Sequence, residues 1–172
     1  APGADALRSE LEALGAQVMI AACDVGDAEA VGKLVKEIGE SGIPLKAVVH
    51  TAGVVSQVVL DELEPEAVAR ELAAKVSGAR HLHEATLELD LDAFILYSSI
   101  AGLWGSGQQA TYSAANAALD SLARYRRQRG LAGLALHWGP WAGEGMVGGT
   151  DGPGDLDARL RKRGLTPMQP AP

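Results

Sequence analysis

Residues 92–139, DAFILYSSIAGLWGSGQQATYSAANAALDSLARYRRQRGLAGLALHWG, place a long helical pattern between two short apolar runs. The runs at 92–99 and 133–139 have the length and composition of buried strands. Between them, Tyr112, Ala115 and Leu119 mark the inward face of an alanine-rich helix. A strand, a helix and a second strand in this order predict a parallel β-α-β unit.

The preceding residues show the same alternation. Apolar runs at 16–25 and 45–53 predict two further strands, and leucines at helical spacing predict a helix over residues 4–14 that stops at Gly15. A second helix is expected after Asp27 as N-cap, and a third from Glu64 to about Leu87 with Pro65 in its first turn. The chain is therefore predicted to be α/β, with parallel strands buried on both faces and ligands at their carboxyl ends.

Length and composition favour a single soluble domain. The chain has 172 residues, of which 47% are hydrophobic but only 4% aromatic, so we expect an aliphatic core. A net charge of −7 argues against a nucleic-acid partner, and no apolar run reaches the roughly 20 residues of a membrane span. The single cysteine, Cys23, excludes an internal disulfide and fits a reducing, cytoplasmic compartment.

Both ends of the predicted domain, residues 1–172, are expected to be incomplete. The first strand, glycine-rich turn and helix of a nucleotide-binding half are not among these residues, and we expect them from another chain, a proteolytic partner or further residues. Residues 143–148 match G-x-G-x-x-G, but no helix follows to bind a pyrophosphate. A phosphate-binding loop remains the alternative to our preferred interpretation, in which residues 143–165 form a flexible lid with a short helix.

Two polar residues lie on apolar helix faces. Lys75 falls on the stripe of Val68, Leu72 and Ala79, and Asn116 faces inward four residues after Tyr112. A buried lysine needs a partner, although a lysine that reaches out at the helix edge would explain its position equally simply. An inward asparagine commonly forms structural hydrogen bonds, and a tyrosine at a helix start can be a simple cap. If the tyrosine is instead a proton donor, a nearby cation is needed to favour its phenolate.

Taken together, these residues resemble a known family. Ser99 precedes Tyr112 by 13 residues, the serine–tyrosine spacing of the short-chain dehydrogenases/reductases. That family continues Tyr-x-x-x-Lys, whereas this chain has Tyr-x-x-x-Asn with a lysine at position 75. One branch exchanges the two residues in this way, the ketoreductase domains of modular polyketide synthases. The segments KVSGARHLHE, YSSIAGLWGSGQQATYSAANAALDSLARYRRQRG and HWGPWAGEGM are similar to that branch, and the resemblance spans essentially the whole chain.

The resemblance implies a partial Rossmann-like, doubly wound sheet and a bacterial enzyme that uses NADPH. It implies reduction of a β-keto thioester carried on an acyl carrier protein, beside neighbouring synthase domains. Ser99 would hydrogen-bond the ketone, Tyr112 would donate the proton, Lys75 would tune Tyr112 and hold the ribose, and Asn116 would order a relay water. The cofactor-binding residues implied are Asp24, Val25, Ala52, Gly53, Lys75 and Tyr112. We expect no metal, since His81 and His83 point to different helix faces.

The same resemblance predicts the stereochemical outcome. Ketoreductases that give D-alcohols carry Leu-Asp-Asp where this chain has Val55-Ser56-Gln57, and the other group carries a tryptophan at the position of Trp104. Within that group a histidine three residues before the tyrosine accompanies reduction of epimerised substrates, and here this residue is Gln109. With Gln57 and Met146 also placed near the substrate, we expect an L-hydroxyl without an inverted α-substituent, the A1 pattern.

Two other functions remain open from the residues. The first is a redox-inactive or epimerase-only relative, and the second is a structural brace that uses the fold without chemistry. Such domains typically lose the tyrosine or the serine, whereas this chain keeps both, together with Lys75 and Asn116. The intact set of four therefore favours an active reductase.

Overall fold

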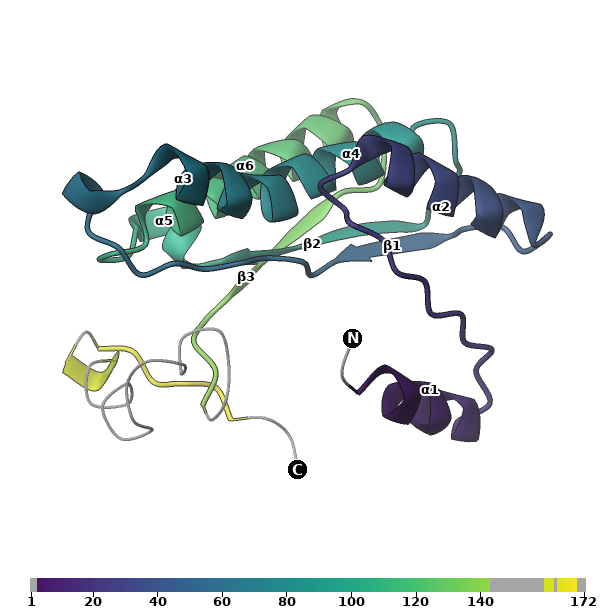
Figure 1. The fold of residues 1–172 in the computed structure, drawn as a ribbon, viewed down its shortest axis with the longest axis horizontal. Helices are drawn as coiled ribbons and strands as arrows, with labels where there is room; N and C mark the ends of the chain where they lie inside the picture. The colour runs from purple at the N-terminus through teal and green to yellow at the C-terminus, as the bar shows by residue number, and fades with distance from the viewer. Residues whose placement is uncertain (1–2, 143–159, 163, 170–172) are drawn as a thin grey trace.

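A three-stranded parallel sheet forms the centre of the computed structural model, which describes residues 3–142, 160–162 and 164–169 (Figure 1). The strands β1 (Ala47–His50), β2 (Ala93–Ser99) and β3 (Leu134–Trp138) lie in the order β1-β2-β3. Both pairs are parallel, with Val48 opposite Phe94 and Ile95 opposite Leu134. The β-α-β unit predicted from residues 92–139 is confirmed.

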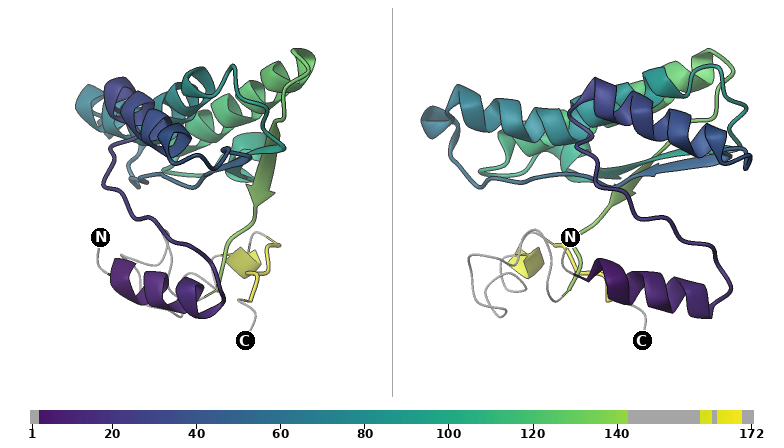
Figure 2. Two further views of the ribbon diagram at one scale, coloured as in Figure 1. Left: turned by 90° about the vertical axis from the view of Figure 1, so that its right-hand side faces the viewer. Right: turned by 45° about the vertical axis from the view of Figure 1, so that its right-hand side comes forward.

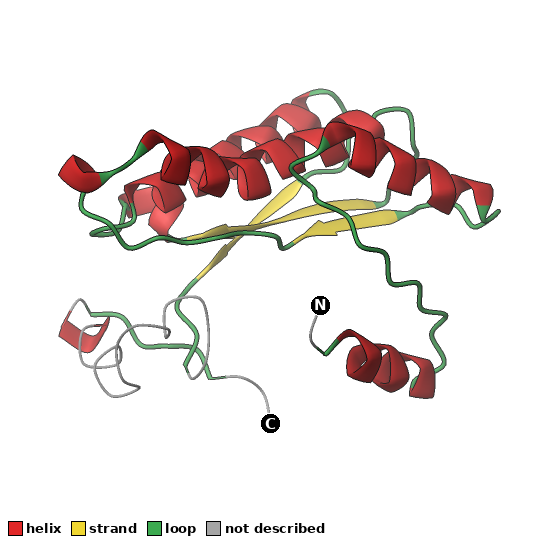
Figure 3. Ribbon diagram, viewed as in Figure 1, coloured by secondary structure: helices red, strands yellow, loops and turns green. Residues whose placement is uncertain are grey.

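Helices cover one face of this sheet, as Figure 3 shows. The covering layer consists of α2 (Ala28–Glu40), α3 (Pro65–Leu72), α4 (Gly78–Ala85) and α6 (Ala110–Gln128). Shorter elements are η1 (Leu60–Glu62) and α5 (Ala101–Trp104), and α1 (Ala4–Ala13) lies apart from the strands on the other side of the sheet (Figure 2). The core lies between β2 and the helices and includes Val48, Ala79, Phe94, Leu96, Leu119 and Ala123.

Local signals in the sequence set most helix boundaries correctly. The Asp27 carboxylate accepts the backbone N–H groups of Glu29 and Ala30, which caps α2 as predicted. After α1 the chain turns at Gly15 with φ of 88°. The long helix expected from Glu64 begins with Pro65 but has an interruption: residues Ala73–Ser77 form the π-helix η2, which joins α3 to α4. A π-helical turn contains one residue more than an α-helical turn, and such turns are frequently found at functional sites.

The strand predicted at residues 16–25 is wrong. Residues 16–24 run as an extended segment between α1 and α2, and they pair with no strand among the described residues. Met19 and Ile20 are both exposed. A strand depends on a hydrogen-bonded neighbour, and residues 16–24 pair with none of the strands β1, β2 and β3. An apolar run alone therefore did not suffice to place this segment in the sheet.

The prediction that all strands are buried on both faces is also wrong. In β1 the side chains of Val48 and His50 are buried under the helices, whereas Val49 is 53% exposed. Leu134 at the start of β3 is exposed as well. The cause is the one-sided helix layer, because in the described part of the chain no helix packs on the opposite face of β1.

The predicted lid falls largely outside the described residues. These exclude residues 143–159, and with them Met146 and the glycine-rich match at 143–148, so the lid stays a prediction. Residues 160–162 are helical, and the segment after them returns to Trp141, where Met168 forms an isolated bridge. The backbone N–H of Ala142 donates to the Met168 carbonyl at 2.8 Å. No helix among the described residues combines the length and the hydropathy of a membrane span.

Candidate active site

Two serines end β2 at its carboxyl edge. Ser98 is buried and its Oγ donates to the backbone carbonyl of Asn116 at 3.3 Å, which ties β2 to α6. Ser99 follows on the other face, and its Oγ accepts the backbone N–H of Ala101 at 3.2 Å. Because that contact uses only a lone pair, the Ser99 hydroxyl proton remains available to a ligand.

Tyr112 and Asn116 lie on the first two turns of α6. The Asn116 side chain is fully buried, and its Nδ2 donates to the Tyr112 carbonyl at 2.8 Å. Its Oδ1 is buried without a hydrogen-bond partner in the described part of the chain. A Cβ at Gly102 would lie 3.0 Å from Asn116 Cβ, so glycine lets α5 approach α6 at this point. The amide oxygen of Asn116 is thus an unused acceptor behind the tyrosine.

Lys75 enters the same region from the neighbouring helix. It sits in η2 with only 4% of its surface exposed, and its Nζ lies 5.3 Å from the centroid of the Tyr112 ring. Among the described residues no carboxylate pairs with it, and burial lowers its pKa from 10.5. A cation held over an aromatic ring is attracted by the ring's negative face. The structure therefore brings Lys75 and Tyr112 together.

His50, which sequence reasoning did not assign, supports this position of Lys75. Its Nε2 donates to the Lys75 backbone carbonyl at 3.0 Å, within the turn where η2 departs from α-helical hydrogen bonding. Burial lowers the pKa of His50 and outweighs the opposing effect of the hydrogen bond to the Lys75 carbonyl, and the charge of Lys75 lowers this pKa further. A Cβ at Gly78 would meet His50 at 3.1 Å and Val25 at 2.8 Å, so the three groups meet closely.

The residues predicted to bind a cofactor differ in their burial and in their contacts. Val25 packs beside His50 at the carboxyl end of β1, and Ala52 and Gly53 follow that end half-buried. Asp24 is exposed, and its Oδ1 accepts the backbone N–H of Gly26 at 2.8 Å, so the side chain caps a local turn. The Asp24 side chain is thus already engaged in a hydrogen bond, while Lys75 and Tyr112 of the same predicted set contact each other.

The residues predicted to control stereochemistry lie on two adjoining loops. Trp104 ends α5 with 64% of its surface exposed, and Gln109 is the N-cap of α6. Gln57 is half-buried in the segment that follows β1. The two loops are joined where the backbone N–H of Val58 donates to the carbonyl of Gln108 at 2.9 Å. Met146, the remaining member of the set, lies outside the described residues.

Sequence reasoning also missed Glu71, a buried carboxylate one turn before Lys75. Its Oε1 accepts both the backbone N–H and the hydroxyl of Ser56, and its Oε2 has no partner within the described ranges. The signal was present in the sequence, since Glu71 stands three residues after Val68 of the apolar stripe and four before Lys75.

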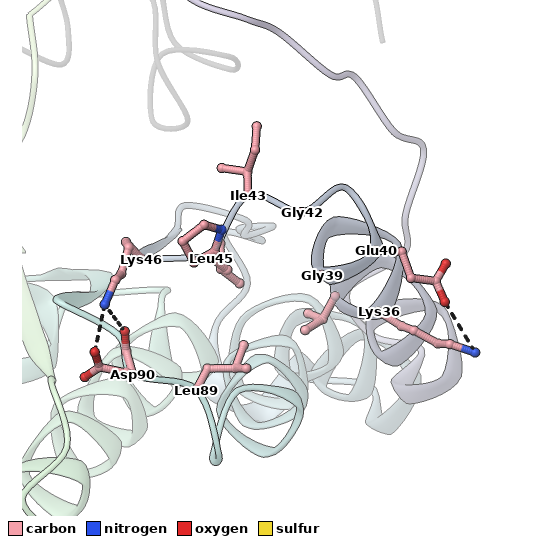
Figure 4. Close-up of a pocket in the computed structure, with 11 residues that line it drawn as sticks. Lys36, Gly39, Glu40, Gly42, Ile43, Leu45, Lys46, Leu89 and Asp90 are labelled. Carbon is pink, nitrogen blue, oxygen red and sulfur yellow. Dashed lines mark hydrogen bonds and ion pairs between the residues drawn. The ribbon is translucent and has the colours of Figure 1, made fainter.

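A pocket elsewhere in the molecule is separate from these groups. It lies before β1 and is lined by Lys36, Gly39, Glu40, Ile43, Leu45 and Leu89 (Figure 4). Lys46 and Asp90 form an ion pair of 2.8 Å at its edge. Because this pocket is at the amino end of β1, whereas Ser99 ends β2 at its carboxyl edge, it belongs to the opposite edge of the sheet.

His81 and His83 make separate contacts. His81 Nδ1 hydrogen-bonds the Val25 carbonyl, while His83 Nδ1 accepts from the buried Arg126 at 2.7 Å. Within the described residues no three His, Cys, Asp or Glu side chains gather as a metal site would require. The two histidines thus serve as hydrogen-bonding groups of the helix layer.

Comparison with known proteins decides the family. The family model described as "KR domain" matches residues 1–143. The chain belongs to the KR domain family. This KR domain is 54% identical over 170 residues to polyketide synthase GfsA of Streptomyces halstedii, covering 99% of this chain and 2% of that protein. It is 51% identical to the pikromycin polyketide synthase component PikAIII of Streptomyces venezuelae, covering 99% of this chain and 10% of that protein.

Solved structures agree with this assignment. The KR domain matches the phoslactomycin ketoreductase PlmKR1 of Streptomyces sp. HK803 with a TM-score of 0.89 and 46% identity, over 98% of this chain and 38% of that one. A structure described as an A1-type ketoreductase matches with a TM-score of 0.88 and 45% identity, over 98% and 35%. The chain thus spans between a third and two fifths of these structures, and its Rossmann-like fold is partial.

Proposed function

We propose that this KR domain catalyses the NADPH-dependent reduction of the β-keto group of an acyl intermediate on an acyl carrier protein. The observation that carries the proposal is the buried Lys75, unpaired by any carboxylate in the described structure, whose Nζ lies over the ring of Tyr112. Burial of a cation costs free energy. A role in proton donation by Tyr112 explains why the chain keeps a lysine at this buried position. The relatives, which are polyketide synthases, support the substrate class.

Each of the four predicted catalytic side chains has a separate role in one proton transfer. The Ser99 hydroxyl donates a hydrogen bond to the ketone oxygen and fixes its position. Tyr112 gives its proton to the same oxygen as negative charge develops there, and the ammonium of Lys75 favours the phenolate that remains. The free Oδ1 of Asn116 accepts from a water that returns a proton to this site. The proton thus passes from Tyr112 to the product hydroxyl.

The residues present fit a nicotinamide cofactor. The Lys75 ammonium, which no described carboxylate neutralises, is suited to a ribose hydroxyl, and the small residues Ala52 and Gly53 after β1 leave the backbone accessible. Val25 beside His50 and the exposed Asp24 are suited to the adenosine portion. Reduced NADPH supplies the hydride when bound. Holding the cofactor would fall to these residues together with Tyr112.

For the product we propose an L-hydroxyl without inversion of the α-substituent. Trp104 stands exposed beside the loop that carries Gln109, where a bulky indole can close one entrance and direct the acyl-phosphopantetheine arm to the other. Entry from the other side presents the opposite face of the ketone to the same hydride. The A1-type ketoreductase among the similar structures supports this assignment.

An assay of NADPH oxidation with a β-keto thioester separates this function from its alternatives. We expect the complete domain that contains these residues to oxidise NADPH in the presence of the thioester. Absence of oxidation, with the α-substituent inverted, would identify an epimerase-only domain. Absence of both reactions in a folded preparation would identify a structural brace.

A further inference from the structure

The loop after β1 is anchored to the Lys75 helix by one buried carboxylate. Glu71 is 3% exposed, and its Oε1 accepts two hydrogen bonds from Ser56, one from the backbone N–H and one from the hydroxyl. Charge-assisted hydrogen bonds of this kind are stronger than those between neutral groups. Glu71 therefore fixes both the backbone and the side chain of Ser56 against α3.

Ser56 lies between two residues that bear on the substrate path. Val55 and Gln57 flank it directly, and the next backbone N–H, that of Val58, donates to Gln108 on the loop that holds Trp104. Gln108 itself has φ of 61°, a left-handed conformation that is uncommon for a residue other than glycine. A strained residue is retained when the surrounding contacts determine it, so the two loops form one connected unit.

The anchoring residue, Glu71, and the catalytic lysine, Lys75, lie in consecutive helical elements, α3 and η2. Glu71 stands four residues before Lys75, and the π-turn η2 lies between α3 and α4. The carboxylate thus connects the loop of Val55, Ser56 and Gln57 to the segment that places Nζ over Tyr112. No carboxylate–ammonium pair joins Glu71 to Lys75 among the described residues, so Glu71 acts through Ser56 rather than on the lysine itself.

We propose that Glu71 is a positioning residue for stereocontrol, which holds residues 55–57 against α3 and so fixes one wall of the path taken by the acyl chain. The inference rests on the proposed ketoreduction, but it does not depend on which alcohol is formed. Without the anchor the loop samples several positions, and both ketone faces become accessible. The chemistry at Ser99 and Tyr112 continues in either case.

Three variants of the complete domain test this proposal. Glu71→Ala removes both hydrogen bonds, whereas Glu71→Gln keeps an oxygen that can accept them and Ser56→Ala removes only the hydroxyl contact. Glu66→Ala, an exposed glutamate on the same helix, is the matched control. Each is measured by thermal unfolding, by the kcat and KM of NADPH oxidation, and by chiral chromatography of the alcohols formed from a racemic 2-methyl-3-keto thioester.

We expect Glu71→Ala to raise the fraction of the minor alcohol about tenfold, because the loss of both hydrogen bonds releases residues 55–57 from α3. The fold-decrease in kcat should be smaller than the fold-decrease in the preference for one face of the ketone. Glu71→Gln should restore the product ratio, Ser56→Ala should lie between the two, and Glu66→Ala should match the parent domain. An unchanged ratio in a folded Glu71→Ala domain would overturn the proposal, as would equal losses in the Ala and Gln variants.

Hydrogen exchange keeps this test separate from the proposed function. Peptides covering residues 54–60 should exchange faster in Glu71→Ala than in the parent domain, and Glu71→Gln should restore their protection. If the parent domain does not reduce the thioester, the proposed function fails while the exchange result still reports on the anchor. Unchanged exchange in Glu71→Ala would remove the anchoring role itself.

Discussion

The Nζ of Lys75 lies 5.3 Å from the centroid of the Tyr112 ring, although the two residues come from different helices. The π-turn η2 carries the lysine and the start of α6 carries the tyrosine, so the contact depends on how these helices pack rather than on either alone. In the common arrangement of the related enzymes both residues occupy one helix. Here the amine reaches the tyrosine from the adjacent helix, which leaves Asn116 behind the tyrosine on α6.

Replacing Lys75 by methionine should stabilise the folded domain while removing its activity. Burial of the amine lowers its pKa, which means that the folded state disfavours the ammonium at neutral pH. An apolar side chain of similar length avoids this cost, and we expect the free energy of unfolding to rise by about 1 kcal/mol at pH 7. Denaturant titration of the complete domain measures the difference.

The pH dependence of that difference follows from the direction of the shift. Between the lowered pKa of Lys75 and 10.5, the unfolded chain binds more protons than the folded one, so the stability of the parent domain rises with pH. The advantage of Lys75→Met should therefore shrink across this window. Lys33→Met, at an exposed site, is the control and should show no such trend. A stability difference that widens with pH would contradict a buried lysine that has no carboxylate partner among the described residues.

Gly102 should not tolerate a side chain. A Cβ there would lie 3.0 Å from Asn116 Cβ and 3.1 Å from the backbone nitrogen of Ala117, so α5 would have to move away from α6. We expect Gly102→Ala to lower the free energy of unfolding by about 1–3 kcal/mol. Gly32→Ala, in the exposed interior of α2 with open space around it, should raise it by about 0.5–1 kcal/mol. Equal effects in denaturant titrations of the two variants would contradict the close approach.

The sequence predicted those parts of the fold that depend on neighbouring residues. The Asp27 cap and the β-α-β unit of residues 92–139 follow from local spacing and are present in the structure. The strand expected at 16–25 and the burial of both faces of β1 depend on partners distant in the sequence, and both predictions failed. Periodicity reports which residues are apolar, but not whether a neighbouring strand or helix is there to cover them.

In the candidate site, too, the features that depend on distant partners could not be predicted from the sequence. Lys75 stood out because a lysine interrupts an apolar stripe, and the structure places it beside Tyr112. Arg126, one of four arginines between residues 124 and 129, is buried, with its guanidinium 3.8 Å from the centroid of the Phe94 ring. The sequence does not indicate which of these arginines is buried, because the partners of Arg126, His83 and Phe94, come from other elements.

The stereochemical proposal predicts a specific alcohol. With a racemic 2-methyl-3-keto thioester, we expect the complete domain to form predominantly the L-alcohol with an uninverted methyl group. Trp104→Ala should weaken the preference, because it opens the entrance that the indole closes. Chiral chromatography distinguishes the products. A predominantly D-alcohol would refute the assignment, and an L-alcohol with the inverted methyl group would refute only the role of Gln109.

The most direct measurement is NADPH oxidation by Tyr112→Phe in the complete domain, compared with Tyr125→Phe. Both tyrosines lie on α6, but the Tyr125 hydroxyl contacts only the exposed Arg129 at 2.9 Å among the described residues. We predict that Tyr112→Phe lowers turnover of a β-keto thioester by about 10²–10⁴-fold, because it removes the proton donor. Affinity for NADPH should stay nearly unchanged, because Lys75 and the residues after β1 remain to hold the cofactor, and Tyr125→Phe should retain full activity. Undiminished turnover in Tyr112→Phe would contradict the account.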